Sequence, residues 1–174
     1  MHISPATASD LPAIAALVNS AYRGDSSRQG WTTEADYLGG QRTDAQALGH
    51  DLATKPESVL LTLRDEAGGP LLACAWLEPA TDGAWYLGML TVRPDLQDRK
   101  LGRTILETAE AHARALGARR IIMTVVQIRD TLIAWYERRG YASTGETRPF
   151  PYDDQRFGEP MRDDLAFIVL AKTI

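Results

Sequence analysis

The stretch "TVRPDLQDRKLGRTIL", residues 91–106, decides how this chain is interpreted. It runs from an apolar strand through Pro94 into a polar turn and then into the start of a helix. Arg93, Arg99, Lys100 and Arg103 surround that turn, although the formal net charge of the chain is −4. The first N–H groups of a helix lack partners within it, and the helix dipole makes that end positive. The turn therefore predicts a site for a phosphate or another small polyanion.

Gly102 lies in the middle of this turn, where a missing Cβ lets a ligand approach the backbone. A solvated helix start with ordinary surface charges is the alternative interpretation. The sequence holds no GxxxxGK[ST] and no GxGxxG, which excludes the P-loop and Rossmann cradles. The negative net charge also disfavours nucleic acid as a partner.

Composition limits the remaining possibilities. Cys74 is the single cysteine and lies in the apolar run "LLACAWL", so we expect a buried, inert thiol and no disulfide. His2, His50 and His112 have no ligand spacing, so we expect no metal. We find no signal peptide and no apolar stretch of 18 residues, so we expect a cytoplasmic protein that does not bind a membrane.

Hydrophobic periodicity predicts a mixed α/β chain in one domain, residues 1–174. Helical patterns cover 9–24, a short piece at 34–38, a segment from 43 to 54, 101–117 and 130–140. Strand patterns cover 58–64 and 71–79, which form a predicted hairpin, and 84–92, 119–127 and 165–171. The strand over 119–127 should run parallel to 84–92 across the helical crossover. Gly88 interrupts the strand over 84–92, as at a bulge or a close backbone approach.

Two blocks resemble the GNAT superfamily of acetyl-CoA-dependent N-acetyltransferases. The pattern L-x-V-x-P-x-x-Q-x-x-K-x-G-x-x-x-L over 90–106 is similar to the family's Q/R-x-x-G-x-G/A turn. Gln97 and Gly102 match, whereas Lys100 replaces the first glycine, and we expect Lys100 to offer its N–H from an ordinary φ. Residues 129–141 are similar to N-x-x-A-x-x-x-Y-x-x-x-G-F/Y, with Tyr136 on the tyrosine and Arg129 in place of the asparagine.

The resemblance implies a GNAT-like, mostly antiparallel central sheet of six to seven strands with about four flanking helices. A splayed strand pair, opened by a bulge at Gly88, would form the slot for coenzyme A. Acetyl-CoA would then be the cosubstrate. The implied cofactor-binding residues are Leu90, Thr91, Val92, Gln97, Asp98, Arg99, Lys100, Leu101, Gly102, Arg103, Thr104 and Arg129.

The implied chemistry is direct attack of an amine on the acetyl carbonyl. Tyr136 would be the general acid for the departing thiolate, since a phenol with a pKa near 10 is protonated at neutral pH. The alternative is a core aromatic, which is common at helical spacing. Glu34 and Glu78 are the candidate bases, but each could be a solvated surface residue or the end of a water chain.

Trp31, Phe150 and Tyr152 are the candidate residues for acceptor recognition; loop packing or a homodimer contact is the alternative, and exposed aromatic residues favour it. The sequence thus predicts an N-acetyltransferase acting on a small-molecule or N-terminal primary amine. A non-catalytic CoA-binding sensor module of the same fold is the alternative, and an acyltransferase for a longer acyl chain is a third possibility.

Overall fold

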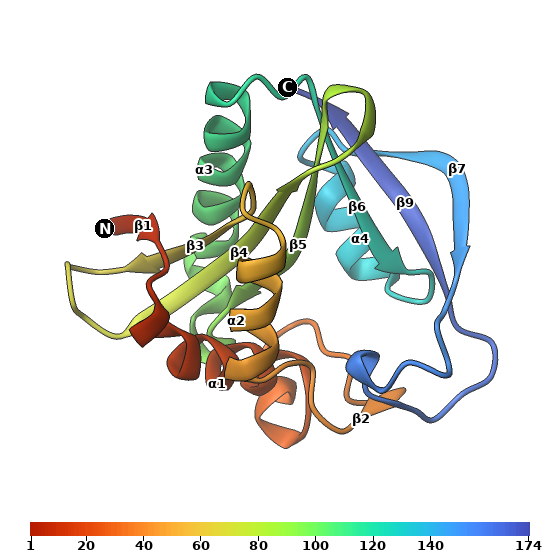
Figure 1. Cartoon of the computed structure of the whole chain (residues 1–174). Helices are drawn as coiled ribbons and strands as arrows, with labels where there is room; N and C mark the ends of the chain where they lie inside the picture. Colours follow the sequence, from red (N-terminus) through yellow and green to blue (C-terminus); the bar gives the residue numbers. More distant parts are fainter.

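A computed structural model describes all 174 residues and contains a seven-stranded sheet in the order β1-β3-β4-β5-β6-β9-β7 (Figure 1). Every neighbouring pair is antiparallel except β5 and β6, which are parallel as predicted. The strands are β1 (His2–Pro5), β3 (Val59–Arg64), β4 (Leu71–Pro79), β5 (Ala84–Val92), β6 (Arg120–Val126), β7 (Ala142–Pro149) and β9 (Ala166–Thr173). A separate antiparallel pair joins β2 (Leu38–Gly39) to β8 (Glu159–Pro160).

Four α-helices accompany this sheet, which confirms the predicted fold class. They are α1 (Leu11–Tyr22), α2 (Ala45–Thr54), α3 (Leu101–Ala115) and α4 (Asp130–Glu137). No helix combines the length and the apolar character needed to cross a membrane. The helical piece predicted at 34–38 is wrong: the Glu34 carbonyl accepts bonds from the N–H groups of Tyr37 and Leu38, which closes a single turn before β2 begins.

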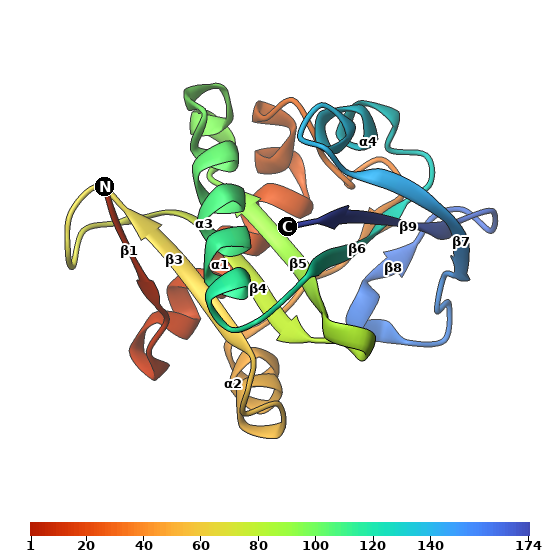
Figure 2. The ribbon, with the colours of Figure 1, turned by 90° about the horizontal axis from the view of Figure 1, so that it is seen from above.

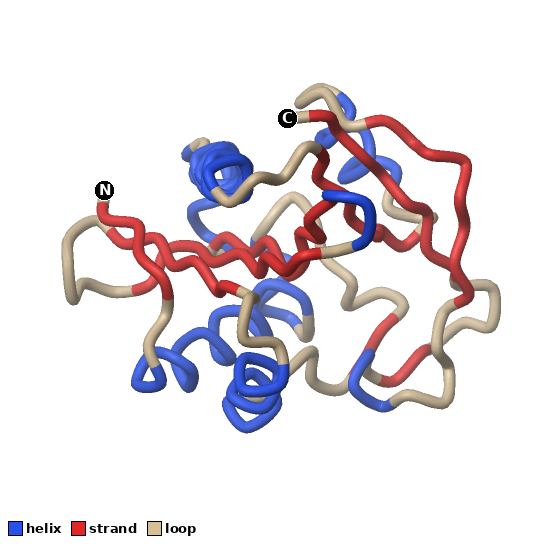
Figure 3. Tube along the Cα trace, turned by 45° about the horizontal axis from the view of Figure 1, so that its top comes forward, coloured by secondary structure: helices blue, strands red, loops and turns tan.

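The helices cover opposite faces of the sheet, α3 on one side and α1 with α2 on the other (Figure 3). Side chains alternate along a strand, so Cys74 and Trp76 of β4 pack with α1 and α2 while Ala73 and Ala75 pack on the face of α3. Helix α3 lies against β4 and β5 (Figure 2). Cys74 is fully buried, as expected, and burial raises the pKa of its thiol to about 12.

Strands β5 and β6 pair over only three residues of each, Ala84–Tyr86 with Arg120–Ile122, and then separate (Figure 1). The cause is a bulge in β5. Gly88 faces Trp76 and Thr91 faces Cys74, so two residues of β5 oppose one of β4. The predicted bulge at Gly88 is therefore wrong in position: residues 89 and 90 lie opposite the single residue 75, and Met89 has a φ of +50°.

At position 88, any side chain larger than that of glycine would clash with a residue of the same strand. A Cβ at this position would lie 2.8 Å from Cε1 of the Tyr86 ring. The Tyr86 hydroxyl shares a hydrogen bond of 3.0 Å with Thr124 of β6. The missing side chain thus leaves room for a tyrosine that bridges the two strands where they begin to part.

Candidate functional site

Two adjoining cavities lie where β5 and β6 separate. The first, of about 200 Å³, is lined by Ala21, Tyr22, Trp31, Thr32, Leu90, Thr91, Val92, Gln97, Lys100, Gly102, Arg103, Arg129, Leu132, Trp135, Tyr136 and Arg139. The second, of about 90 Å³, is bounded by residues 86–90 of β5, residues 123–126 of β6, a phenylalanine cluster and four charged side chains. Both cavities share Tyr22, Leu90, Arg129, Leu132 and Tyr136. These five residues form the junction between them.

The start of α3 borders the first cavity and lacks a side-chain cap. Its first ladder bond runs from the Thr104 N–H to the Lys100 carbonyl at 3.1 Å. The Lys100 N–H itself has no backbone acceptor. Uncapped N–H groups at a helix start are the donors that an anion can satisfy.

Lys100 holds a left-handed backbone, with a φ of +62°. The expectation of an ordinary φ at this position is therefore wrong. A residue with a Cβ adopts this conformation at a cost of about 1 kcal/mol or more, whereas glycine adopts it freely. Lys100 thus reproduces the backbone of the glycine that it replaces in the pattern, with strain.

The cations around the turn differ in how far they are neutralised. Arg93 contacts Asp95 at 2.7 Å and Arg103 contacts Glu107 at 2.7 Å. Arg99 and Lys100 are exposed and make no ion pair. Lys100 and Arg103 line the first cavity. The adjacent Arg99 and Asp98 do not.

Most other predicted cofactor-binding residues meet at the first cavity, namely Leu90, Thr91, Val92, Gln97, Gly102 and Arg129. Leu101 is different, because its side chain is buried in the core beneath α3. Thr104 is half-buried and lines neither cavity. Gln97 uses its side-chain oxygen to accept the Trp31 N–H at 3.0 Å, which ties the loop before β2 to the polar turn.

Tyr136 is buried at the junction and lines both cavities. Its ring packs edge-to-face against Trp135 at 5.0 Å and Tyr141 at 5.6 Å, so it is also part of the core. Its hydroxyl has no hydrogen-bond partner in the protein. Burial raises the pKa of Tyr136, and the neighbouring Tyr22 raises it further. The phenol therefore keeps its proton at neutral pH and can donate it to a group in either cavity.

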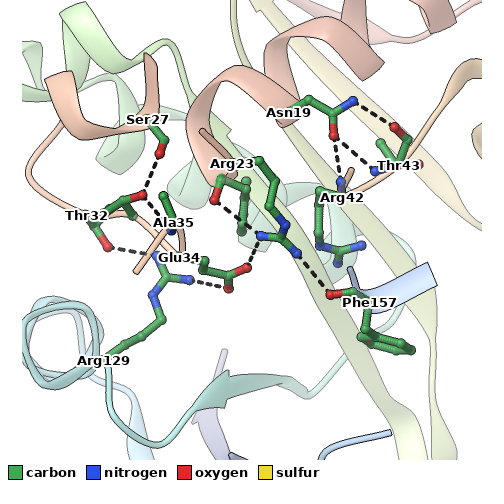
Figure 4. A network of polar contacts seen from close by, with 12 residues as sticks. Asn19, Arg23, Ser27, Thr32, Glu34, Ala35, Arg42, Thr43, Arg129 and Phe157 are labelled. Atoms are coloured by element: carbon green, nitrogen blue, oxygen red, sulfur yellow. Dashed lines mark hydrogen bonds and ion pairs between the residues drawn. The ribbon is translucent and has the colours of Figure 1, made fainter. Parts of the chain in front are cut away.

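Arg129, at the start of α4, joins a buried ion-pair network (Figure 4). It donates to Glu34 at 2.9 Å and to the Thr32 hydroxyl at 2.8 Å. The second Glu34 oxygen accepts from Arg23 at 2.5 Å, and Arg23 also donates to the Phe157 carbonyl. One buried carboxylate therefore holds two guanidinium groups. The Nε atoms of both arginines are buried without a partner.

The two candidate bases occupy different surroundings. Glu34 lines the second cavity and is the only carboxylate that lines either one. Glu78 instead contacts the Lys55 ammonium at 2.6 Å and accepts the Trp76 indole N–H at 3.1 Å. It lines neither cavity.

The three predicted acceptor residues are also separated. Trp31 lines the first cavity, with its ring 6.2 Å from that of Trp135. Phe150 lines the second cavity with two other phenylalanines. Tyr152 lines neither, and its hydroxyl accepts the Leu165 N–H at 2.7 Å.

Sequence reasoning assigned no site role to Tyr22, Arg23 or Arg42, all of which line the second cavity. The Tyr22 hydroxyl donates to the Leu90 carbonyl at 3.1 Å. Arg23 and Arg42 lie in or beside polar loops without a motif. The signal in the sequence is weak: Arg23 directly follows α1, and Arg42 lies in the polar loop just before α2. No group of three or more His, Cys, Asp or Glu is placed to hold a metal ion.

Comparison with known proteins agrees with this geometry. Residues 14–141 match the Acetyltransferase (GNAT) family. An amino-acid acetyltransferase of Azotobacter vinelandii is 36% identical over 84 residues, which is 48% of this chain but only 18% of that protein. An IAA acetyltransferase of Azospirillum brasilense is 29% identical over 106 residues, covering 59% of this chain and 68% of that protein.

A crystal structure of ribosomal-protein-alanine N-acetyltransferase from Brucella melitensis superposes over the full length of both chains. Its TM-score is 0.72 at 19% identity. The corresponding Escherichia coli ribosomal-protein-S18-alanine enzyme gives 0.69 at 18% identity, over 99% of this chain and 93% of that chain. At such identities the likeness concerns the fold. The match over residues 14–141, on this fold, establishes that the chain belongs to the GNAT family of acetyltransferases.

Proposed function

We propose that this protein, as one domain, moves the acetyl group of acetyl-CoA directly to a primary amine of a small molecule or an N-terminus. One observation carries the proposal: Tyr136 stands where two cavities meet, and the uncapped start of α3 borders the first of them. This arrangement supports a cosubstrate in the first cavity and an acceptor in the second.

The residues present fit a diphosphate at the first cavity. The start of α3 offers N–H donors without a side-chain cap, and Lys100 and Arg103 add positive charge beside them. Gly102 adds no side chain there, where its Cβ would lie 3.4 Å from Trp135. When bound, acetyl-CoA supplies the acetyl group as a thioester.

The side chains support direct transfer rather than an acetylated enzyme. Cys74 lines neither cavity, and no histidine lines either one. The Thr124 hydroxyl is hydrogen-bonded to Tyr86 and has no base beside it. An activated nucleophile needs such a base or a lowered pKa. We infer that the acceptor itself attacks the thioester.

The same lack of a free base favours an amine over an alcohol as the acceptor. Both oxygens of Glu34 are engaged by arginines, whereas an alcohol would need a base to remove its proton. A neutral amine is a stronger nucleophile than a neutral alcohol, so it attacks first and loses its proton afterwards. The cations of the second cavity lower the pKa of a bound amine, which favours that neutral form.

The transfer moves one proton from the nitrogen and one proton to the sulfur. The amine nitrogen forms a bond to the acetyl carbon, the carbon–sulfur bond breaks, and the nitrogen loses a proton to water. Tyr136 donates its proton to the sulfur and recovers one from solvent. Both Glu34 oxygens are engaged by arginines, so in this proposal water rather than Glu34 takes the amine proton.

A thiol-release assay with a panel of amines tests this function. We expect CoA release that depends on both acetyl-CoA and an amine, with N-acetylated product detected by mass spectrometry. Tight CoA binding without release for any amine would instead support the sensor module.

A further inference from the structure

We propose that the acceptor carries a carboxylate in addition to its amine, and that Arg42 binds this carboxylate. The inference rests on the proposed acetyl transfer and narrows its substrate class. Arg42 lines the second cavity and is half-buried. Its guanidinium makes no ion pair and no hydrogen bond, whereas its backbone N–H bonds to Asn19 (Figure 4).

The charged side chains that line the second cavity are mainly positive, which favours an anionic ligand. Three arginines and one glutamate line it. Arg23 and Arg129 both pair with Glu34, whereas Arg42 makes no ion pair, although Asp44, Asp51 and Glu159 line the open groove that it also borders. A half-buried cation without a partner is unfavourable. A carboxylate matches the two-pronged donor geometry of a guanidinium.

Arg42 is also placed to hold the acceptor near the junction. The guanidinium groups of Arg42 and Arg129 each lie over the Tyr22 ring, 5.8 Å from its centroid. The Tyr22 hydroxyl reaches Leu90, and both residues belong to the junction with Tyr136. A carboxylate at Arg42 and an amine near Tyr136 therefore lie in one cavity, which Tyr22 also lines.

The sizes of the cavities favour a short spacing between the two groups. The second cavity measures about 90 Å³. Arg42 also lines an open polar groove of about 690 Å³ formed with α2 and residues 155–159. The amine end of the acceptor fits the small cavity, and bulk beyond the carboxylate can extend into the groove.

The test compares α- and ω-amino acids with their own carboxamides. The kcat/KM of each pair is measured for the unaltered protein, for Arg42→Gln and for Arg148→Gln. Arg148 is the control, because it lies on β7, pairs with Glu146 and lines neither cavity nor the groove. Calorimetric titration of the CoA-saturated protein with the same compounds gives a readout without turnover.

We expect the best amino acid to exceed its carboxamide by roughly tenfold or more in kcat/KM. Arg42→Gln should reduce the kcat/KM of the acid far more than that of the carboxamide and so remove most of the preference, whereas Arg148→Gln should leave both values unchanged. Equal use or equal binding of acids and carboxamides, or a preference that survives Arg42→Gln, would overturn the inference while amine acetylation stands. If no amine releases CoA, the proposed function fails; calorimetric selectivity for acids that needs Arg42 would still support the carboxylate site.

Discussion

The Arg129 guanidinium donates to the Glu34 carboxylate at 2.9 Å, across 95 residues of sequence. This contact links the start of α4, the helix that carries Tyr136, to the loop around Glu34, which lines the second cavity. Because Glu34 also holds Arg23, it is the single anion on which the local arrangement depends. Its removal should therefore affect the fold before it affects proton transfer.

Glu34→Gln should lower the free energy of unfolding by about 3 kcal/mol, because two guanidinium groups stay buried beside a neutral amide. Urea titration followed by circular dichroism measures this loss. Asp36→Asn is the matched control, since its pair with Arg28 is exposed and should contribute less than about 1 kcal/mol. Unchanged stability together with a kcat lowered by about 100-fold would assign Glu34 to catalysis instead.

Tyr136→Phe should lower kcat by about 100-fold and leave acetyl-CoA affinity within about twofold, because only the donated proton is lost. The phenyl ring keeps the edge-to-face contacts with Trp135 and Tyr141. Steady-state kinetics and calorimetry measure the two quantities. Tyr141→Phe is the control: it loses a 2.9 Å bond to Glu110 outside both cavities, so it should reduce stability and not kcat. An unchanged kcat for Tyr136→Phe would show that Tyr136 is not the general acid and serves only as an aromatic residue of the core.

Lys100→Gly and Lys100→Ala separate the charge of this residue from its backbone strain. Both remove the ammonium, so both should raise the Kd for acetyl-CoA several-fold and weaken its salt dependence. Only glycine adopts a φ of +62° without backbone strain, so the Lys100→Gly variant should be about 1 kcal/mol more stable than Lys100→Ala. Thermal unfolding and calorimetry measure both effects. Equal stability of the two variants would show that the strain is negligible, and an unchanged Kd would remove Lys100 from the cosubstrate site.

The pH profile of kcat/KM should rise with pH until it approaches the pKa of the free acceptor amine, about 10 for an alkylamine, because only the neutral amine attacks. Burial raises the pKa of Tyr136 above its ordinary value, so ionisation of this acid should not reduce activity over the same range. Initial rates between pH 6 and pH 10 provide the measurement. A plateau that begins near pH 7 would contradict this expectation and indicate an enzyme base that titrates there.

The sequence predicted the elements that rest on local patterns. Periodicity identified all four α-helices and the parallel arrangement of β5 and β6, since a strand, a crossover helix and a second strand follow each other directly in the chain. The polar turn and Tyr136 were found because each has a fixed spacing within one segment. Even so, local patterns could not give the φ of Lys100 or the exact position of the bulge, since both depend on how β5 is aligned with β4 and α3.

The amino-acid sequence by itself thus determined the family, the order of the elements and the turn at the start of α3, because these are encoded in contiguous residues. Only the tertiary structure decided which charges meet. Arg23, Glu34, Arg42 and Arg129 come from four separate segments, and the parting of β5 from β6 makes the space that they surround. Ion pairing acts over a few ångströms in space whatever the separation along the chain, so no spacing in the sequence could reveal that Glu34 is shared and that Arg42 is left without a partner.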